Sequence, residues 1–288
     1  MVVWELDFYS RPLLDDGGKK RWELLLCESP LTVEQDLTSL FRYTAFCRNT
    51  EVNSVWLRQQ LEAAIAQAPA PPDRIRFFRR QMTNMITKAC DDAGLPVTPS
   101  RRTLTLSHWL QERLTSVYPE MPGYSPGVSS SVGYPPSTPQ PLPDALRGDS
   151  WAVLSLQASD LQEMSDWEIQ FGEAFPLSLA DVAPDTPVPG LMIFSPRATA
   201  LGAWMSGLEL AFLSAEPTQV GALGLLLHTG ADEAWVLANL NEAKTRKEAE
   251  AFEMMKQAAN NLHFIGIQTS PDSQSFAGFW LLQERDLA

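Results

Sequence analysis

The sequence predicts a two-domain protein of the α+β (mixed α/β) class. Three observations support this: short segments in which apolar and polar residues alternate, longer segments in which apolar residues recur every three or four positions, and a proline-rich stretch near the middle of the chain. At 288 residues the chain is long for one hydrophobic core and long enough for two. Apolar residues make up 44% of it, so both halves can bury a core.

The first domain, residues 1–120, begins with strands. Trp4, Leu6 and Phe8 alternate with acidic and polar residues, which predicts a strand with one buried face. Two aspartates followed by two glycines at 15–18 form a turn that returns the chain into a second strand. Predicted strands cover residues 4–9, 21–27 and 41–47.

Helices and short strands alternate in the rest of this domain. Apolar residues at three- and four-residue spacing mark the helices, and Gly94 stands where a helix C-cap is expected. We predict helices at 52–68, 81–93 and 106–117 and strands at 75–78 and 97–98. The resulting order, βββαβαβα, is that of ribonuclease-H-like folds, a likeness of topology alone.

Residues 121–150 separate the two domains. They hold seven prolines and four glycines, a composition that cannot build a ladder or a helix and is typical of a linker. The second, smaller α+β domain, residues 151–288, is predicted to contain an antiparallel sheet and one long amphipathic helix at 242–262. Its predicted strands cover residues 191–194, 203–213, 223–228, 234–240, 263–268 and 276–282.

Charge is unevenly distributed along the chain. The net charge is −13, but residues 1–125 carry 15 basic and 15 acidic side chains, so the whole excess lies in 126–288. A polyanionic partner is therefore expected on the N-terminal half.

Cys27, Cys47 and Cys90 are too widely spaced for a disulfide framework or a zinc site. The sequence shows no bilayer-spanning apolar run and no signal peptide, so we expect a soluble, cytoplasmic protein without membrane insertion.

Few residues suggest catalysis. Glu5 and Asp7 share one strand face, with Glu23 nearby on the next strand, and three such carboxylates can hold a divalent metal ion in a nuclease. We favour salt bridges with Arg11 or the basic residues near the turn, because the end of the fourth strand carries arginines where a nuclease needs a further carboxylate. The three histidines lack metal-ligand spacing and are expected to be surface or capping residues. We therefore predict no enzymatic activity, no metal and no cofactor.

Seven blocks of sequence carry a resemblance to a known family. They lie at residues 4–12, 20–24, 52–54, 75–79 with 81–82, 99–103, 143–148 and 279–282. In these blocks, and in their order along nearly the whole chain, the protein resembles the Tab-two-like family, the translation factors of chloroplasts and their cyanobacterial relatives. The resemblance implies binding of A/U-rich RNA and promotion of translation of photosystem reaction-centre mRNA, and so of photosystem biogenesis. Because the sequence shows no transit peptide like that of the chloroplast members, we expect a cyanobacterial cytoplasm as the location. The resemblance assigns no RNA-contacting residue.

Basic side chains near two strand ends are the candidates for RNA contact. Arginines surround two phenylalanines at 74–80 and follow a loop proline and serine at 101–102. Arginine beside an aromatic ring suits phosphate pairing and base stacking, whereas surface salt bridges are the structural alternative. A right-handed crossover through the helix at 81–93 would lay the two strands in parallel and gather these arginines into one basic patch. The candidate RNA-binding residues are Arg76, Arg79, Arg80, Arg101, Arg102, Arg11, Lys19 and Lys20.

We interpret the chain as a translation factor whose first domain binds a single-stranded A/U-rich mRNA leader. The acidic second domain is assigned to protein contacts, with the ribosome, other translation factors or a second copy of the chain in a homo-oligomer as candidate partners. Two alternatives remain open. One is a metal-dependent nuclease, degenerate or active, and the other is a protein-only scaffold for photosystem assembly.

Overall fold

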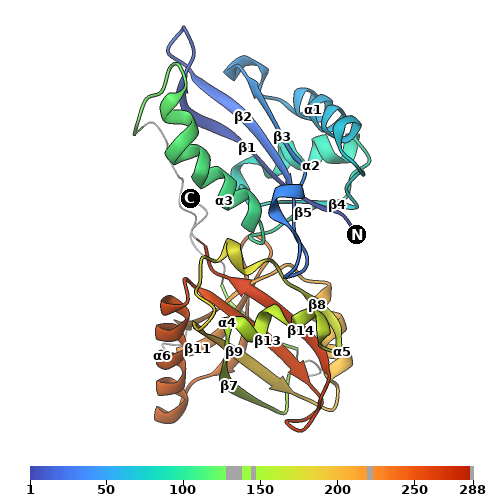
Figure 1. Ribbon diagram of the computed structural model, residues 1–288, viewed down its shortest axis with the longest axis vertical. Helices are drawn as coiled ribbons and strands as arrows, with labels where there is room; N and C mark the ends of the chain where they lie inside the picture. Colours follow the sequence, from blue (N-terminus) through green and yellow to red (C-terminus); the bar gives the residue numbers. More distant parts are fainter. Residues whose placement is uncertain (128–137, 144–146, 219–222, 286–288) are drawn as a thin grey trace. The chain divides into compact units, whose positions relative to one another are not determined.

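The computed structural model describes residues 1–127, 138–143, 147–218 and 223–285. The chain divides into two compact units, which we call the N-terminal and the C-terminal unit. Residues 1–29 and 37–127 belong to the first, and residues 30–36 join the described residues from 138 onward in the second. Figure 1 shows both units, each with its own sheets and helices.

The N-terminal unit is built on one five-stranded sheet with the strand order β3-β2-β1-β4-β5. Strand β2 runs antiparallel to both of its neighbours, β1 and β3, whereas β1, β4 and β5 are mutually parallel. The elements are β1 (Val3–Leu14), β2 (Lys20–Glu28), β3 (Arg42–Cys47), α1 (Ser54–Gln67), β4 (Arg74–Phe77), α2 (Thr83–Asp92), β5 (Val97–Pro99) and α3 (Leu104–Glu112). This confirms the predicted order of elements along the chain. The ribonuclease-H-like likeness rests on that order alone and stays a prediction.

Both faces of this sheet are covered, as Figure 1 shows, with α3 on one side and α1 and α2 on the other. Trp4, Leu6 and Phe8 of β1 are fully buried in the core that includes residues of α1 and α2, as their alternation predicts. Leu25 and Cys27 of β2 point to the opposite face and pack in the cluster formed with α3. The acidic residues of β1 alternate with its apolar residues, so they also face a buried layer.

The β1–β2 hairpin is held at its tip by a short segment that follows α3. The backbone N–H of Leu14 donates to the carbonyl of Gly123 over 2.8 Å, and that of Ser125 donates to Pro12 over 3.0 Å. Gly123 has φ of 82°, and a Cβ there would lie 2.2 Å from the Leu14 carbonyl oxygen, so only glycine allows this approach. Part of the predicted linker is thus paired with a strand.

A second part of the predicted linker also pairs. Gln140–Pro141 forms strand β6, which lies parallel to Trp235 and Val236 at the edge of a sheet in the C-terminal unit. The expectation that residues 121–150 build no ladder is therefore wrong at both places, because proline is tolerated on an edge strand where no ladder hydrogen bond is required of it. Residues 128–137 and 144–146 of the predicted linker lie outside the described part of the chain.

The C-terminal unit contains two sheets, with the strand orders β10-β11-β12-β6 and β7-β9-β13-β14-β8. The single antiparallel sheet that we predicted is wrong, because β13 runs parallel to β9 and β14 runs parallel to β8. This unit is also the larger of the two and not the smaller. Its other elements are β7 (Ser150–Gln157), α4 (Ala158–Gln162), β8 (Ile169–Glu173), β9 (Pro187–Phe194), α5 (Ala198–Ser206), β10 (Leu210–Pro217), β11 (Leu223–Thr229), β12 (Glu233–Asn239), α6 (Ala243–Ala258), β13 (Leu262–Gln268) and β14 (Phe276–Gln283).

One hydrophobic core joins the two sheets of this unit with α5 and α6. The strand predicted over 203–213 is wrong in its first half, which belongs to α5. Ala198, Leu201 and Met205 are buried at helical spacing. The residues between them are mostly apolar too, so the sequence shows no clear helical periodicity of apolar residues here. None of the helices in the described ranges is long and apolar enough to cross a bilayer.

Candidate functional site

A network of buried charges lies on the α3 side of the N-terminal sheet. Asp7 of β1 and Glu23 of β2 are fully buried and accept hydrogen bonds from three arginines. Arg11 bridges the two carboxylates, with 2.9 Å from its Nη1 to Asp7 and 3.0 Å from its Nε to Glu23. Arg79 reaches Asp7 from just after the end of β4, and Arg113 reaches Glu23 from the π-helical segment that continues α3. We call these five residues, together with Tyr118, which also donates to Glu23, the buried network.

The network explains how acidic residues are tolerated in this layer. Burial acts to raise the pKa of Asp7, but the charges and hydrogen bonds of Arg79 and Arg11 outweigh it and hold that pKa below its usual value. Glu5 takes a different partner set, accepting from the Ser29 hydroxyl and from the backbone N–H of Leu106, both over 2.7 Å. The predicted salt bridging with Arg11 is confirmed. Among the described residues, no group of three or more histidine, cysteine, aspartate and glutamate side chains is placed to hold a metal ion.

The predicted RNA-binding residues separate into a buried and an accessible set. Four of them, Arg11, Arg76, Arg79 and Arg102, are between 1% and 7% exposed. The accessible ones are Lys19, which is exposed, and Arg80, Arg101 and Lys20, which are half-buried. Arg76, Arg80, Arg101 and Arg102 each take part in further interactions within the protein. Burial leaves the first set almost no surface for an RNA strand, so we exclude these four arginines from the residues proposed to contact RNA phosphates.

The topological part of the basic-patch prediction is confirmed, because β4 and β5 are adjacent and parallel. Arg79 nevertheless does not project into an open patch at this edge. Arg79 points back to Asp7 on β1 and stacks over Tyr9, with 4.0 Å from the guanidinium carbon to the ring centroid. The structure gives Arg79, a predicted RNA-binding residue, a structural role, since it neutralises a buried carboxylate. That carboxylate lies 72 residues away in the sequence, so the sequence pattern does not show it as the partner of Arg79.

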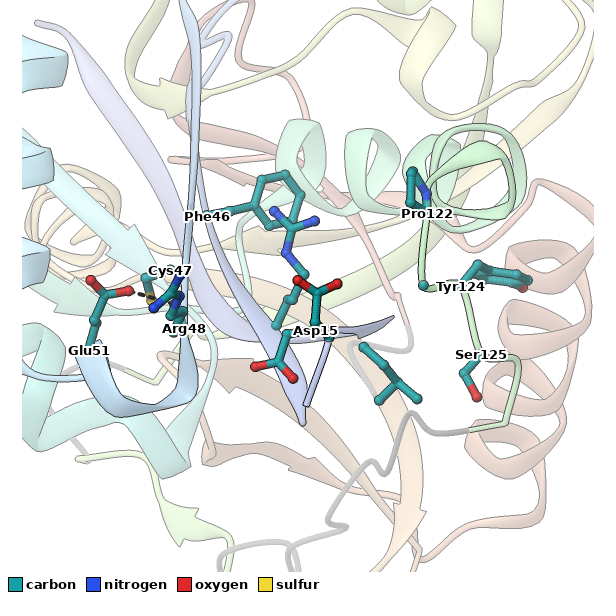
Figure 2. Close-up of a pocket in the computed structure, with 12 residues that line it drawn as sticks. Asp15, Phe46, Cys47, Arg48, Glu51, Pro122, Tyr124 and Ser125 are labelled. Atoms are coloured by element: carbon teal, nitrogen blue, oxygen red, sulfur yellow. Dashed lines mark hydrogen bonds between the residues drawn. The ribbon is translucent and has the colours of Figure 1, made fainter. Parts of the chain in front are cut away.

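An open pocket lies at the tip of the β1–β2 hairpin, and we call it the hairpin-tip pocket. Figure 2 shows Cys47, Arg48 and Glu51 on one side of it and Pro122, Tyr124 and Ser125 on the other, with Phe46 and Asp15 between them. Its volume is about 660 Å³. The remaining lining residues are Leu14, Asp16, Arg21 and Gly123. All of them belong to the N-terminal unit, and Asp15 and Asp16 come from the turn that connects β1 and β2.

Two cations of this pocket, Arg21 and Arg48, are absent from our predicted set. The antiparallel register pairs Trp22 of β2 with Cys47 of β3, so the residues one step beyond this pair approach each other at the end of the sheet. Arg48 is exposed and Arg21 is half-buried. The signal was present in the sequence, since both arginines adjoin correctly predicted strands. Recognising that the two arginines lie close together requires the strand register, which the sequence pattern alone does not provide.

Two of the histidines differ from our expectation. His263 is fully buried and His228 is 7% exposed, so neither is a surface residue. The Nε2 of His263 accepts the backbone N–H of Leu213 over 2.8 Å, and burial, together with the charge of Lys256, lowers its pKa to about 3. His263 therefore acts as a neutral hydrogen-bond acceptor that joins two sheets.

Comparison with known proteins accounts for most of the chain. Residues 3–113 match the family model for the N-terminal part of the RNA-binding protein Tab2/Atab2, and residues 129–283 match that for its C-terminal domain. A chloroplastic TAB2 homolog of Zea mays is 39% identical over 97% of this chain and 70% of its own length. One of Arabidopsis thaliana is 38% identical over 97% of this chain and 74% of its own. No solved structure matches. The chain belongs to the Tab2/Atab2 family of RNA-binding proteins.

Proposed function

We propose that this protein binds A/U-rich single-stranded mRNA through its N-terminal unit and promotes translation of photosystem reaction-centre mRNA. The observation that carries the proposal is family membership over both units, since the family is described by RNA binding and not by a catalysed reaction. The translational and photosystem role is what the resemblance in sequence implies. The three cysteines are free thiols, which supports a reducing compartment such as the cytoplasm.

Charge and accessibility support the N-terminal unit as the RNA-binding part. Residues 1–125 are electrically neutral as a whole, whereas residues 126–288 carry the entire net charge of −13. A strongly acidic surface repels a phosphate backbone, which makes the C-terminal unit the weaker candidate. In the N-terminal unit the exposed cations Lys19 and Arg48 lie at the hairpin tip and beside it. We therefore place the RNA strand along this end of the sheet.

A mobility-shift experiment with the full chain tests the proposal. At physiological salt we expect a shifted complex with an A/U-rich single-stranded RNA and a weaker one with a G/C-rich strand of equal length. Translation of a reporter mRNA in a cell-free system, with and without an A/U-rich leader, then tests the second step. If no RNA is bound at any salt concentration, the proposal fails and a protein-only role in photosystem assembly takes its place.

A further inference from the structure

We propose that the hairpin-tip pocket receives one unpaired base of the bound RNA, stacked against the guanidinium group of Arg21. This inference rests on the proposed RNA binding and adds the place at which a nucleotide is held. The pocket provides a stacking surface, a suitable volume, a mixed set of charges and a fixed wall.

The stacking surface consists of Arg21 and Phe46. The guanidinium carbon of Arg21 lies over the Phe46 ring, 4.5 Å from its centroid, and both side chains line the pocket. The ring thereby supports one face of the planar guanidinium group. Unpaired RNA bases stack on aromatic rings and on arginine planes of this kind. The proposed base extends this stack by one layer on the pocket side.

The size of the pocket fits a nucleotide. Its volume of about 660 Å³ lies within the range of roughly 300–1,000 Å³ that is typical of small-molecule sites. A base and its ribose fit into such a volume, and the open side leaves a path for the strand to continue. A folded RNA helix is too wide to enter, so the occupant is single-stranded.

The charges favour a base over a bare phosphate group. Two arginines line the pocket, but Asp15, Asp16 and Glu51 line it as well, so its formal charge is negative. Asp15 already accepts the backbone N–H groups of Gly17 and Lys19, and Glu51 accepts that of Arg48. The exposed carboxylate of Asp16 can accept a hydrogen bond from a base edge. A neutral base with donors at its edge suits this arrangement, whereas the negative charge of a phosphodiester group is repelled by the acids.

The wall opposite Arg48 is fixed in place. Hydrogen bonds from Leu14 to Gly123 and from Ser125 to Pro12 attach the segment that carries Tyr124 to β1. The side chain of Tyr124 is 37% exposed in spite of its size. A preformed wall lowers the entropy lost on binding. Lys19, on the same hairpin turn, and Arg48, which lines the pocket, are exposed cations that we assign to the flanking phosphates.

The full chain carrying R21Q and R48Q together tests the proposal, with R58Q as a matched control on α1, outside the pocket. Binding is measured by fluorescence anisotropy with a labelled 12-nucleotide A/U-rich RNA, after equal melting temperatures have been verified. We expect R21Q/R48Q to bind at least about tenfold more weakly, a loss of about 1.4 kcal/mol, because the variant lacks the plane on which the base stacks and a cation beside it. R58Q should bind like the unaltered protein.

The outcomes separate the two proposals. If the unaltered protein does not bind the RNA, the proposed function fails. If it binds and R21Q/R48Q binds within a factor of two of R58Q, RNA binding stands and the pocket assignment is overturned. Should the double variant unfold, R21K alone decides, because it keeps the positive charge and removes the planar group on which the base stacks. In that case a loss of less than twofold for R21K overturns the assignment.

Discussion

The N-terminal unit contains two groups of arginines that look alike in the sequence and differ in the structure. Those of the buried network are at most 9% exposed and neutralise two buried carboxylates. Those of the hairpin-tip pocket are half-buried or exposed, and Arg21 lies over an aromatic ring. The first group stabilises the layer beneath α3, and the second remains accessible to a ligand. The role of each arginine therefore depends on whether an acidic partner faces it across the sheet.

The largest expected effect comes from removing the central acid of the buried network. Asp7→Asn leaves Arg11 and Arg79 without their shared anion in a buried layer. Breaking one partner of a buried pair typically costs about 3–5 kcal/mol, and we expect a decrease of this size in the free energy of unfolding. Urea denaturation measures it. Asp16→Asn, an exposed acid of the hairpin turn, serves as the control and should change stability by less than about 0.5 kcal/mol. Equal, small losses in both variants would show that the network does not stabilise the unit.

The second prediction concerns the wall of the hairpin-tip pocket. Gly123→Ala adds a Cβ that would meet the Leu14 carbonyl, in addition to the left-handed backbone at φ of 82°. Gly127→Ala has an equally positive φ of 85° but no neighbour within 4 Å, so it isolates the backbone cost of about 1–2 kcal/mol. We expect Gly123→Ala to lose more stability than Gly127→Ala and to weaken RNA binding, as measured by thermal unfolding and anisotropy. If the two alanine variants lose equal stability and bind RNA equally well, the close approach of Gly123 to Leu14 does not hold this wall of the pocket in place.

A third prediction extends the comparison to a buried group that is kept neutral. The pKa of His263 is lowered by burial to about 3, below the unfolded value of about 6.5, so the unfolded state binds more protons in between. Stability should therefore fall as the pH decreases below about 6.5, by about 2 kcal/mol between pH 7 and pH 5. His263→Gln retains an acceptor for Leu213 and should flatten this dependence in urea titrations. His108→Gln, at an exposed position, should leave the slope unchanged. If His263→Gln retains the pH dependence of stability, another titrating group causes that dependence.

The smallest expected effect is on the salt dependence of RNA binding. Lys19→Ala and Lys20→Ala together should flatten the slope of log affinity against log salt by about 1.4, since each phosphate contact with a single strand contributes about 0.7. The melting temperature should stay nearly the same, because Lys19 is exposed and Lys20 is the half-buried first residue of β2. Lys88→Ala on α2 removes a cation that is paired with Asp92 and should not change the slope. An unaltered slope in the double variant would place the phosphates elsewhere.

Much of the N-terminal fold could be predicted from local pattern. The alternation of Trp4, Leu6 and Phe8 gave the correct buried face, and the aspartate–glycine turn gave the correct hairpin. The parallel neighbours β4 and β5 followed from the handedness of crossovers. These features depend on residues close in sequence or on general rules of chain topology.

The site could be predicted only in part, because it depends on contacts between distant residues. Arg79 and Asp7 are far apart in the sequence, and nothing local distinguishes Arg79, which is buried, from Arg80, which is half-buried. Arg48 and Tyr124 line the same pocket only because a segment after α3 pairs with β1. In the C-terminal unit α5 was missed because its apolar residues surround the helix axis. Predicting such features requires knowledge of the strand register and of the packing on the sheet.

Photo-crosslinking tests most directly whether RNA lies at the hairpin tip. The full chain is irradiated with an A/U-rich RNA that contains 4-thiouridine, and the crosslinked peptides are identified by mass spectrometry. The structure predicts adducts in residues 15–25, 46–51 and 122–125, around the hairpin-tip pocket. The unlabelled RNA should compete for all of them. Crosslinks confined to residues 151–285, with none at the hairpin tip, would contradict the assignment of RNA binding to this end of the N-terminal unit.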